Sequence, residues 1–220
     1  MKLHHIVLLS CLLVWSSTSF CKLSEKENQR LDSLNNIIEE AKHDTLVAKA
    51  YLDLSEILYL INFDTVIVLF EKAVEISTRN LEGNITRNER MSFQIILSGA
   101  YNNIGYIYDD QGKVVESLNY YHKSLKIREE INDSLAIAIS LNNIGIIYVN
   151  QGETNQALDY YLRSLEIKEH LGNKKSIATS LNNIGAIYRN NGEMLKALDY
   201  YNRSLKIREE LGNKRGGQSL

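Results

Sequence analysis

The side chains that most often perform catalysis or hold metal ions are few and scattered in this 220-residue chain. The five histidines are His4, His5, His43, His122 and His170. None stands at metal-ligand spacing from a cysteine or a carboxylate, so we expect solvated surface histidines rather than zinc ligands. Cys11 and Cys21 both lie near the N-terminus without a downstream partner, which excludes a disulfide framework. The sequence predicts a non-catalytic protein with no metal or cofactor.

Three other patterns only imitate functional sites. The stretch Gly212–Gly217 has the composition of a phosphate loop but lacks the Gly-x₄-Gly-Lys-Ser/Thr order and a preceding strand, so we interpret it as an inter-repeat turn. Tyrosine pairs at 120–121, 160–161 and 200–201 suggest a stacking platform for bases or sugars, but their helical spacing favours packing. Mixed-charge runs such as Lys126–Glu130 predict exposed helix faces with i,i+4 ion pairs.

Paired asparagines are the pattern with the most chemical content. They are Asn102 and Asn103, Asn142 and Asn143, and Asn182 and Asn183. Asparagine is a poor helix former, so helix propensity does not explain the presence of six of them. An amide both donates and accepts hydrogen bonds, and can therefore bind the backbone of an extended peptide regardless of its sequence. The alternative is that duplication copied these amides and that they bond to neighbouring repeats or to water.

The asparagines belong to a unit that repeats every 40 residues. Tyr101-Asn-Asn-Ile-Gly105 returns at 141–145 and 181–185 with leucine in place of the tyrosine, and the segments 141–173 and 181–213 share 23 of 33 residues. Within a unit, apolar residues recur at three- and four-residue steps, which predicts two helices. Asn191-Gly192 supplies a left-handed stop between them. We expect the second helix to run from about Glu193 to Leu211-Gly212-Asn213.

The same three- and four-residue steps predict the apolar faces of the two helices in the last unit. The first helix carries Ile177, Leu181, Ile184, Gly185 and Tyr188, and the second carries Leu195, Leu198, Tyr201, Leu205 and Ile207. Helix pairs repeated in tandem stack into a solenoid. The absence of proline from the chain fits a stack of long helices. The predicted fold is therefore all-α, an α-solenoid.

These residues resemble the tetratricopeptide repeat, whose pattern is a large residue, x₂, Leu, Gly, x₂, Tyr, then Ala, x₃ and an aromatic. The pattern stands here as Leu141-x₂-Ile144-Gly145-x₂-Tyr148 and Ala157-x₃-Tyr161, and it returns 40 residues later. The 40-residue period and the missing proline resemble the long-period subgroup. In that subgroup the small residues sit where the two helices cross, and the first helices line the concave side. The resemblance favours Asn103, Asn143 and Asn183 as the peptide-binding positions.

Counting one, four and five residues past each glycine gives the side chains that would flank this groove. They are Tyr106, Asp109 and Asp110, then Ile146, Val149 and Asn150, then Ala186, Arg189 and Asn190. An acidic, an apolar and a basic unit in sequence would suit a ligand of mixed character, although sequence drift explains the order equally well. The expected partner is a protein or peptide.

The remaining chain is divided by composition and by the same repeat. Residues 1–19 read as a signal peptide, 20–43 as a leading amphipathic helix and 44–90 as a divergent unit with a long turn at 80–90. Regular units occupy 91–132, 133–173 and 174–213, and 214–220 starts a truncated next unit. We expect export to the periplasm or the medium, with lipid anchoring at Cys11 or Cys21 as the weaker alternative.

Two functional classes fit this organisation. The net charge of −2 argues against nucleic-acid binding, and no segment after the signal peptide is apolar enough to span a membrane. The first class is a protein-interaction scaffold that binds a peptide or protein segment in its concave groove. The second follows from a resemblance to the exported sensory regions of bacterial signalling proteins, in which the output part is a membrane histidine kinase or cyclase.

Overall fold

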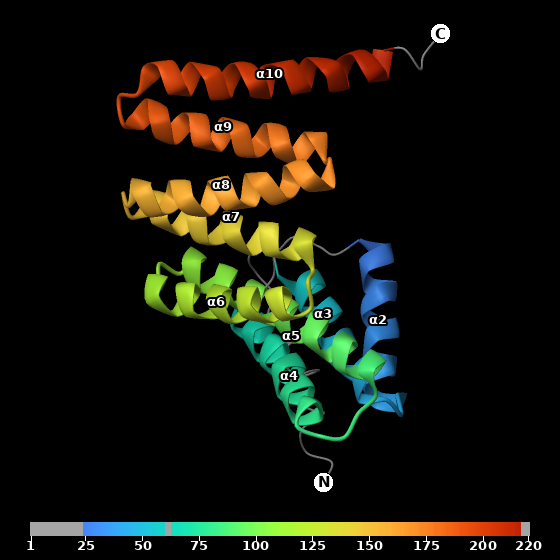
Figure 1. Ribbon diagram of the computed structural model, residues 1–220. Coiled ribbons are helices and arrows are strands. Elements are labelled where there is room, and N and C mark those ends of the chain that lie inside the picture. The colour runs from blue at the N-terminus through green and yellow to red at the C-terminus, as the bar shows by residue number, and fades with distance from the viewer. Residues whose placement is uncertain (1–23, 60–62, 217–220) are drawn as a thin grey trace, which may run out of the picture.

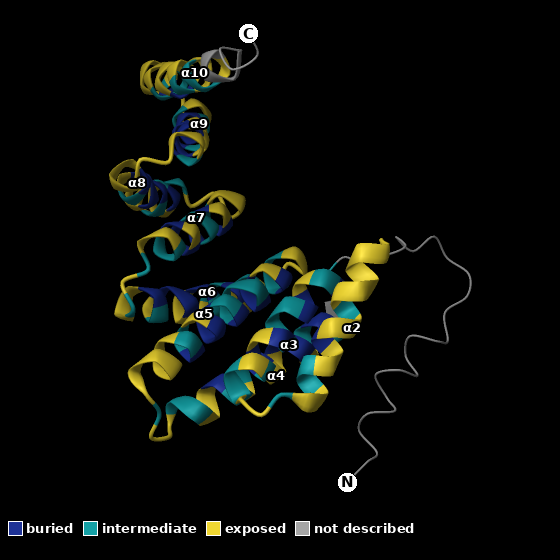
Figure 2. Ribbon diagram, turned by 90° about the vertical axis from the view of Figure 1, so that its right-hand side faces the viewer, coloured by how far each residue is buried: buried dark blue, intermediate teal, exposed yellow. Residues whose placement is uncertain are grey.

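Every described element of the computed structural model, which describes residues 24–59 and 63–216, is a helix, and the helices after the first form antiparallel pairs (Figure 1). The helices are α2 (Glu25–Glu40), α3 (Asp44–Leu58), α4 (Phe63–Leu81), α5 (Arg87–Asp110), α6 (Val114–Glu130), α7 (Ser134–Asn150), α8 (Thr154–Leu171), α9 (Lys174–Asn190) and α10 (Met194–Gly216). The pairs stack in chain order, with α10 at the far end of the row (Figures 1 and 2). The predicted all-α solenoid is confirmed.

The leading helix is shorter than its predicted range of 20–43. Helix α2 begins after Ser24, whose hydroxyl accepts a hydrogen bond from the Glu27 amide while the Glu27 carboxylate accepts one from the Ser24 amide. This capping box satisfies two amides that the first turn leaves without partners. Leu34 buries the inner face of α2 against α3. The predicted signal peptide, Cys11 and Cys21 lie outside the described residues.

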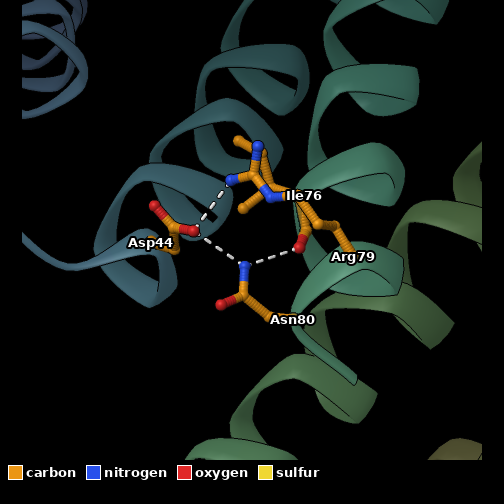
Figure 3. A network of polar contacts seen from close by, with 4 residues as sticks. All are labelled: Asp44, Ile76, Arg79 and Asn80. Atoms are coloured by element: carbon orange, nitrogen blue, oxygen red, sulfur yellow. Dashed lines mark hydrogen bonds and ion pairs between the residues drawn. The ribbon is translucent and has the colours of Figure 1, made fainter. Parts of the chain in front are cut away.

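The divergent unit is the pair α3 and α4, held together at its open end by Asp44. The Asp44 carboxylate accepts hydrogen bonds of 2.8 Å from Arg79 and from Asn80, and Asn80 also donates to the carbonyl of Ile76 (Figure 3). The Asn80 and Arg79 hydrogen bonds hold the pKa of Asp44 below its usual range. These contacts tie the start of α3 to the end of α4.

The long turn predicted for 80–90 is wrong in extent. Helix α4 continues to Leu81 and α5 begins at Arg87, so the ten extra residues mainly lengthen α5 to 24 residues against 17 in α7 and α9. A second capping box explains the early start, because the Thr86 side chain accepts from the Glu89 amide and the Glu89 carboxylate accepts from the Thr86 amide. The Thr-x-x-Glu spacing was the sequence signal for it.

The three regular units follow the predicted register. Gly112, Gly152 and Gly192 take positive φ angles of 71°, 77° and 79° between the two helices of each unit. Where those helices cross, a Cβ on Gly145 would lie 2.8 Å from ring carbons of Tyr161, and one on Gly185 would lie 2.9 Å from those of Tyr201. In the first unit Ser117 replaces the alanine and donates a 2.7 Å hydrogen bond to the Gly105 carbonyl.

The end of α10 departs from prediction. The same Leu-Gly-Asn sequence ends α8, where Gly172 takes a φ of 70°, but α10 continues through Gly212 to Gly216. Residues 214–216 therefore extend α10 instead of starting a next unit, and 217–220 lie outside the described residues. Glycine accepts both conformations. At Gly172 the packing of α9 back onto α8 favours the left-handed one, and no helix in the described part of the chain does this after α10.

The apolar face predicted for α10 is also only half right. Ala197 is buried and Tyr201 and Ile207 are partly buried, but Leu195, Leu198 and Leu205 are exposed. The first helix of this unit, by contrast, buries Ile177, Leu181 and Ile184 as predicted. Leu198 and Leu205 occupy positions that the following helix covers on α6 and α8, whereas the position of Leu195 is exposed on α6 as well, at Val115.

Candidate functional site

The six asparagines lie on α5, α7 and α9, the first helices of the three regular units. Contacts join α3 with α5 and α5 with α7, while no contact of similar extent joins two second helices in the described ranges. First helices therefore run along the inner side of the row. The side chains of the asparagine ladder (Asn102, Asn103, Asn142, Asn143, Asn182 and Asn183) are partly buried, except for the exposed Asn182.

Between the first two regular units the ladder is closed on itself. The Asn143 amide donates a 3.2 Å hydrogen bond to Oδ1 of Asn102, and the Asn102 amide donates one of 3.2 Å to Oδ1 of Asn103. Asn102 and Asn143 thus connect α5 with α7 directly. At this junction the amides bond to the neighbouring repeat, which was the alternative to peptide binding.

A buried arginine completes this closed part. Nη1 of Arg128, near the end of α6, donates to the Ser140 hydroxyl at 2.7 Å, to the Ala136 carbonyl at 2.9 Å and to Asn102 Oδ1 at 3.4 Å. Burial lowers the pKa of Arg128. The ordinary pKa of a guanidinium group is so high that the side chain still carries its charge at neutral pH. The expectation that the run Lys126–Glu130 forms an exposed face is wrong for Arg128, which is 7% exposed because α7 packs over it.

The junction between the last two units has a lysine in the same place. Nζ of Lys168, near the end of α8, donates to the Ser180 hydroxyl of α9 at 2.8 Å. Burial lowers the pKa of this ammonium group. This ammonium group makes no hydrogen bond to the asparagines of the ladder, whereas the guanidinium of Arg128 does. Asn142, Asn182 and Asn183 make no side-chain hydrogen bond to any other residue that the structure describes, so this part of the ladder is open.

The burial of Arg128 and Lys168 was not predicted, although the sequence contains a signal for it. A basic residue stands 12 positions before a serine in both junctions, at Arg128 and Ser140 and at Lys168 and Ser180. Because charged residues sit mostly on surfaces, the repeat of this spacing did not by itself indicate burial. The next unit of the stack covers both side chains.

The predicted flanking residues occupy corresponding positions at the ends of the three first helices. Tyr106 packs its ring 5.6 Å from that of Tyr59, and partial burial together with the neighbouring Asp110 raises the pKa of Asp109. On α7, Ile146 and Val149 are exposed apolar side chains and Asn150 is exposed. On α9, Arg189 donates to Asn190 at 3.3 Å, and Ala186 is partly buried. The row runs from acidic and aromatic through apolar to basic.

Two features are absent from the described residues. No group of three or more histidine, cysteine, aspartate or glutamate side chains lies close enough to hold a metal ion in these residues. Within the same ranges, no helix combines the length and the apolar character needed to cross a bilayer.

The chain is similar to known repeat proteins in sequence pattern and in fold. Residues 97–170 and residues 177–211 each match a model described as tetratricopeptide repeat. BtubC (BKLC) from P. vanneervenii is 19% identical, with 84% of this chain and 72% of that chain covered and a TM-score of 0.67. Aspartyl phosphate phosphatase F from Bacillus subtilis is 17% identical, with 85% and 50% covered and a TM-score of 0.72. A comparison with curated proteins returns no match.

A third similar structure is a Rap protein complexed with competence and sporulation factor, at 18% identity and a TM-score of 0.62. The alignment covers 86% of this chain and 52% of that chain, so the chain spans about half the length of this structure and of the phosphatase. At these identities the likeness concerns the fold. The helix pairs, the glycine–tyrosine crossings and the two family matches agree: the chain is a tetratricopeptide-repeat protein.

Proposed function

We propose that the chain is a non-catalytic scaffold that binds an extended peptide or protein segment along the inner side of its first helices. The observation that supports this most strongly is the open part of the ladder. Three amides on two adjacent first helices, Asn142, Asn182 and Asn183, have no hydrogen-bond partner in the described residues. Asn142 and Asn183 are partly buried, and a partly buried amide without a partner loses hydrogen bonds that a peptide backbone can restore.

The flanking side chains suggest which segment would fit. An extended peptide advances about 3.3 Å per residue, so a few residues reach from one unit to the next. Asp109 and Asp110 on α5 favour a basic residue at one end of the segment. Ile146 and Val149 on α7 favour an apolar residue in the middle, and Arg189 on α9 favours an acidic residue at the other end.

The test is a selection of peptides from a random display library on the wild-type protein. Each amide contributes about 0.5–1.5 kcal/mol of net hydrogen bonding. Alanine at Asn142, Asn182 and Asn183 together should therefore weaken the binding of the selected peptides by about one to three powers of ten. Circular dichroism should show unchanged helicity, because alanine is the better helix former. Equal binding by the triple variant would contradict the proposal.

The fold neighbours permit the idea of a peptide ligand without identifying one. One of them was solved with competence and sporulation factor bound. The second class, the sensory half of a membrane histidine kinase or cyclase, is compatible with the same groove. Reading the gene downstream of Leu220 distinguishes the two classes, because the second requires a membrane helix and a kinase or cyclase motif there.

Export belongs to the proposal as well. The apolar run Ile6–Trp15, followed by small residues, favours cleavage after Ser19. Mass spectrometry of the exported protein should then find Phe20 or Cys21 at its N-terminus. An intact Met1, or a chain that starts at Lys22 or beyond, would contradict this cleavage site.

A further inference from the structure

Helix α7 is apolar on two faces, although its place in the stack buries only one of them. The apolar residues of the buried face are Ala138, Leu141, Ile144 and Ile147. Those of the other face are open to solvent, with exposed fractions of 53%, 42%, 37% and 36%, and they are Leu135, Ile139, Ile146 and Val149. An exposed apolar surface on a soluble protein is typical of an interaction site when its residues lie together.

The repeat itself does not require this second apolar face. Helix α9 buries the same Ser-Leu-x₂-Ile-Gly-x-Ile sequence as α7, at 180–187 against 140–147. Its positions that correspond to the exposed apolar residues of α7 are nevertheless mostly polar, namely Lys175, Thr179, Ala186 and Arg189. The stacking of the units therefore does not explain the exposed apolar residues of α7.

The exposed residues of α7 have the spacing of a coiled-coil seam. Together with Asn142 they stand at steps of four, three, four and three residues, at positions 135, 139, 142, 146 and 149. A mean step of about 3.5 residues is the one at which two helices supercoil and interlock their side chains. The row covers about 21 Å along the helix axis. We call these five residues the α7 seam, and its form suits one helix that lies along α7.

Two polar features define which helix would fit. Asn142, in the middle of the α7 seam, makes no side-chain hydrogen bond to any residue that the structure describes. A single amide in such a seam fixes the register, because a hydrogen-bonding side chain opposite it is favoured over an apolar one. On the neighbouring first helix, Lys175 and Arg189 are exposed, and α9 contains no acidic residue. Acidic residues along one flank of the bound helix would complement these charges.

We propose that the α7 seam binds one amphipathic helix of a partner protein. This helix carries apolar residues in heptad spacing, an amide in the middle and acidic residues along the flank that faces α9. It lies along α7, whereas the extended peptide proposed above crosses from α7 to α9. The inference therefore goes beyond the proposed function, and the two ligands would compete because both contact Asn142.

The chain's own segments lack the required chemistry. Helix α7 of a second copy contains no charged residue that could face Lys175 and Arg189. Residues 1–23, 60–62 and 217–220 also contain no acidic side chain. A following unit of the same chain would stack on α10 at the end of the row, and not on α7 in its middle (Figure 1).

The experiment titrates a fluorescent synthetic peptide into the full-length protein. The peptide has three heptads, with leucine at the seam positions, one asparagine at the central seam position and glutamate along one flank. Saturable binding is expected. Ile139→Glu should weaken it by about tenfold or more, because the substitution places a carboxylate among the apolar residues of the seam. Lys175→Glu should weaken it by a few fold and favour a peptide with lysine in place of the glutamates.

Asn142→Leu tests the register of the bound helix. The wild-type protein should bind the peptide with the central asparagine more tightly than one with leucine in that place. Asn142→Leu should reverse this preference, because each mismatched pair leaves one amide without a partner. The same preference in both proteins would contradict the proposed register and with it the seam.

Val115→Glu is the matched control for a change at an exposed apolar residue. Val115 lies on α6, outside the seam, and is 79% exposed. The double variant Asn182→Ala with Asn183→Ala removes amides of the extended-peptide site and keeps the seam, so failure of one proposal is distinguishable from failure of the other. Helix binding that is unchanged in both controls supports the proposal. Absent binding, equal binding by Ile139→Glu, or loss of binding in the double variant overturns it.

The free protein provides the last test. The variant Ile139→Cys should react rapidly with iodoacetamide at position 139, as peptide mapping by mass spectrometry would show, and slowly once the peptide is bound. Slow reaction in the free protein would overturn the proposal and make a segment of the same chain the occupant. Wild-type dimers that Ile139→Glu converts to monomers, seen by sedimentation, would overturn it in favour of a second copy.

Discussion

The junction of α6 with α7 and the junction of α8 with α9 are built from nearly the same sequence but differ in one cation. Arg128 reaches a serine, a backbone carbonyl and an asparagine, and the amides around it bond to each other. Lys168 reaches only the serine, and the amides beside it have no partner in the described residues. One side chain thus separates a closed part of the ladder from an open part.

This difference shows that repeated residues need not share a role. Asn102 and Asn142 occupy the same position in successive units, yet Asn102 bonds to two residues from other helices and Asn142 to none in the described chain. The closed part stabilises the stack, and we assign ligand binding to the open part. The prediction of equal roles for Asn103, Asn143 and Asn183 follows from their position within the unit alone and does not include the hydrogen bonds.

The largest expected effect tests what the two junctions share, namely the glycine under a tyrosine. In Gly145→Leu the new side chain meets the Tyr161 ring, and overpacking of this kind costs about 1–3 kcal/mol of unfolding free energy. Gly185→Leu should cost less, because Tyr201 is partly exposed and has room to move. Urea unfolding of both variants measures the difference.

Gly99→Ala is the control for these two substitutions. Gly99 is also inside a helix, but a Cβ there would lie at an ordinary 3.5 Å from Leu52. Alanine should therefore raise stability by about 0.5–1 kcal/mol through its higher helix propensity. A loss at Gly99 as large as that at Gly145 would contradict the packing account.

An exchange of the two cations addresses the difference directly. Arg128→Lys should lose the hydrogen bonds to Asn102 and Ala136 and lower the unfolding free energy by about 1 kcal/mol. Lys168→Arg should bring a guanidinium within reach of Asn142 and raise stability by a smaller amount. Thermal unfolding measures both changes, and equal shifts in the same direction would mean that the cation does not decide the state of the ladder.

The smallest effect is a change in pH dependence. Burial raises the pKa of Tyr161 to about 12, above its ordinary value near 10. The folded state holds this proton more tightly, so its contribution to stability is complete below pH 10 and is lost as the pH rises toward 12. Tyr161→Phe should therefore make the loss of stability above pH 10 less steep than in the wild type. The partly exposed Tyr188, changed to Phe, is the control, and the same slope in all three proteins would be the contrary result.

The sequence was sufficient for the helix pairs and their crossings, because these depend on residues within one unit. At each crossing the tyrosine ring leaves no room for a side chain on the facing helix, as at Gly145 beside Tyr161, and this requirement returns in each unit. The burial of Arg128 and the exposure of Leu205 depend instead on whether a following helix packs there, which a local pattern does not contain. The start of α5 was a missed local signal, since Thr86 and Glu89 have capping-box spacing.

The direct test of the central claim compares two double variants against one selected peptide by isothermal titration calorimetry. Asn142→Ala with Asn182→Ala removes amides of the open part, and Asn102→Ala with Asn103→Ala removes amides of the closed part. We predict that the first pair weakens binding by about fivefold or more and leaves the melting temperature unchanged, since about 1–3 kcal/mol of hydrogen bonding is lost in the complex alone. The second pair should lower the melting temperature and change the affinity less. The reverse order of affinities would contradict the division of the ladder.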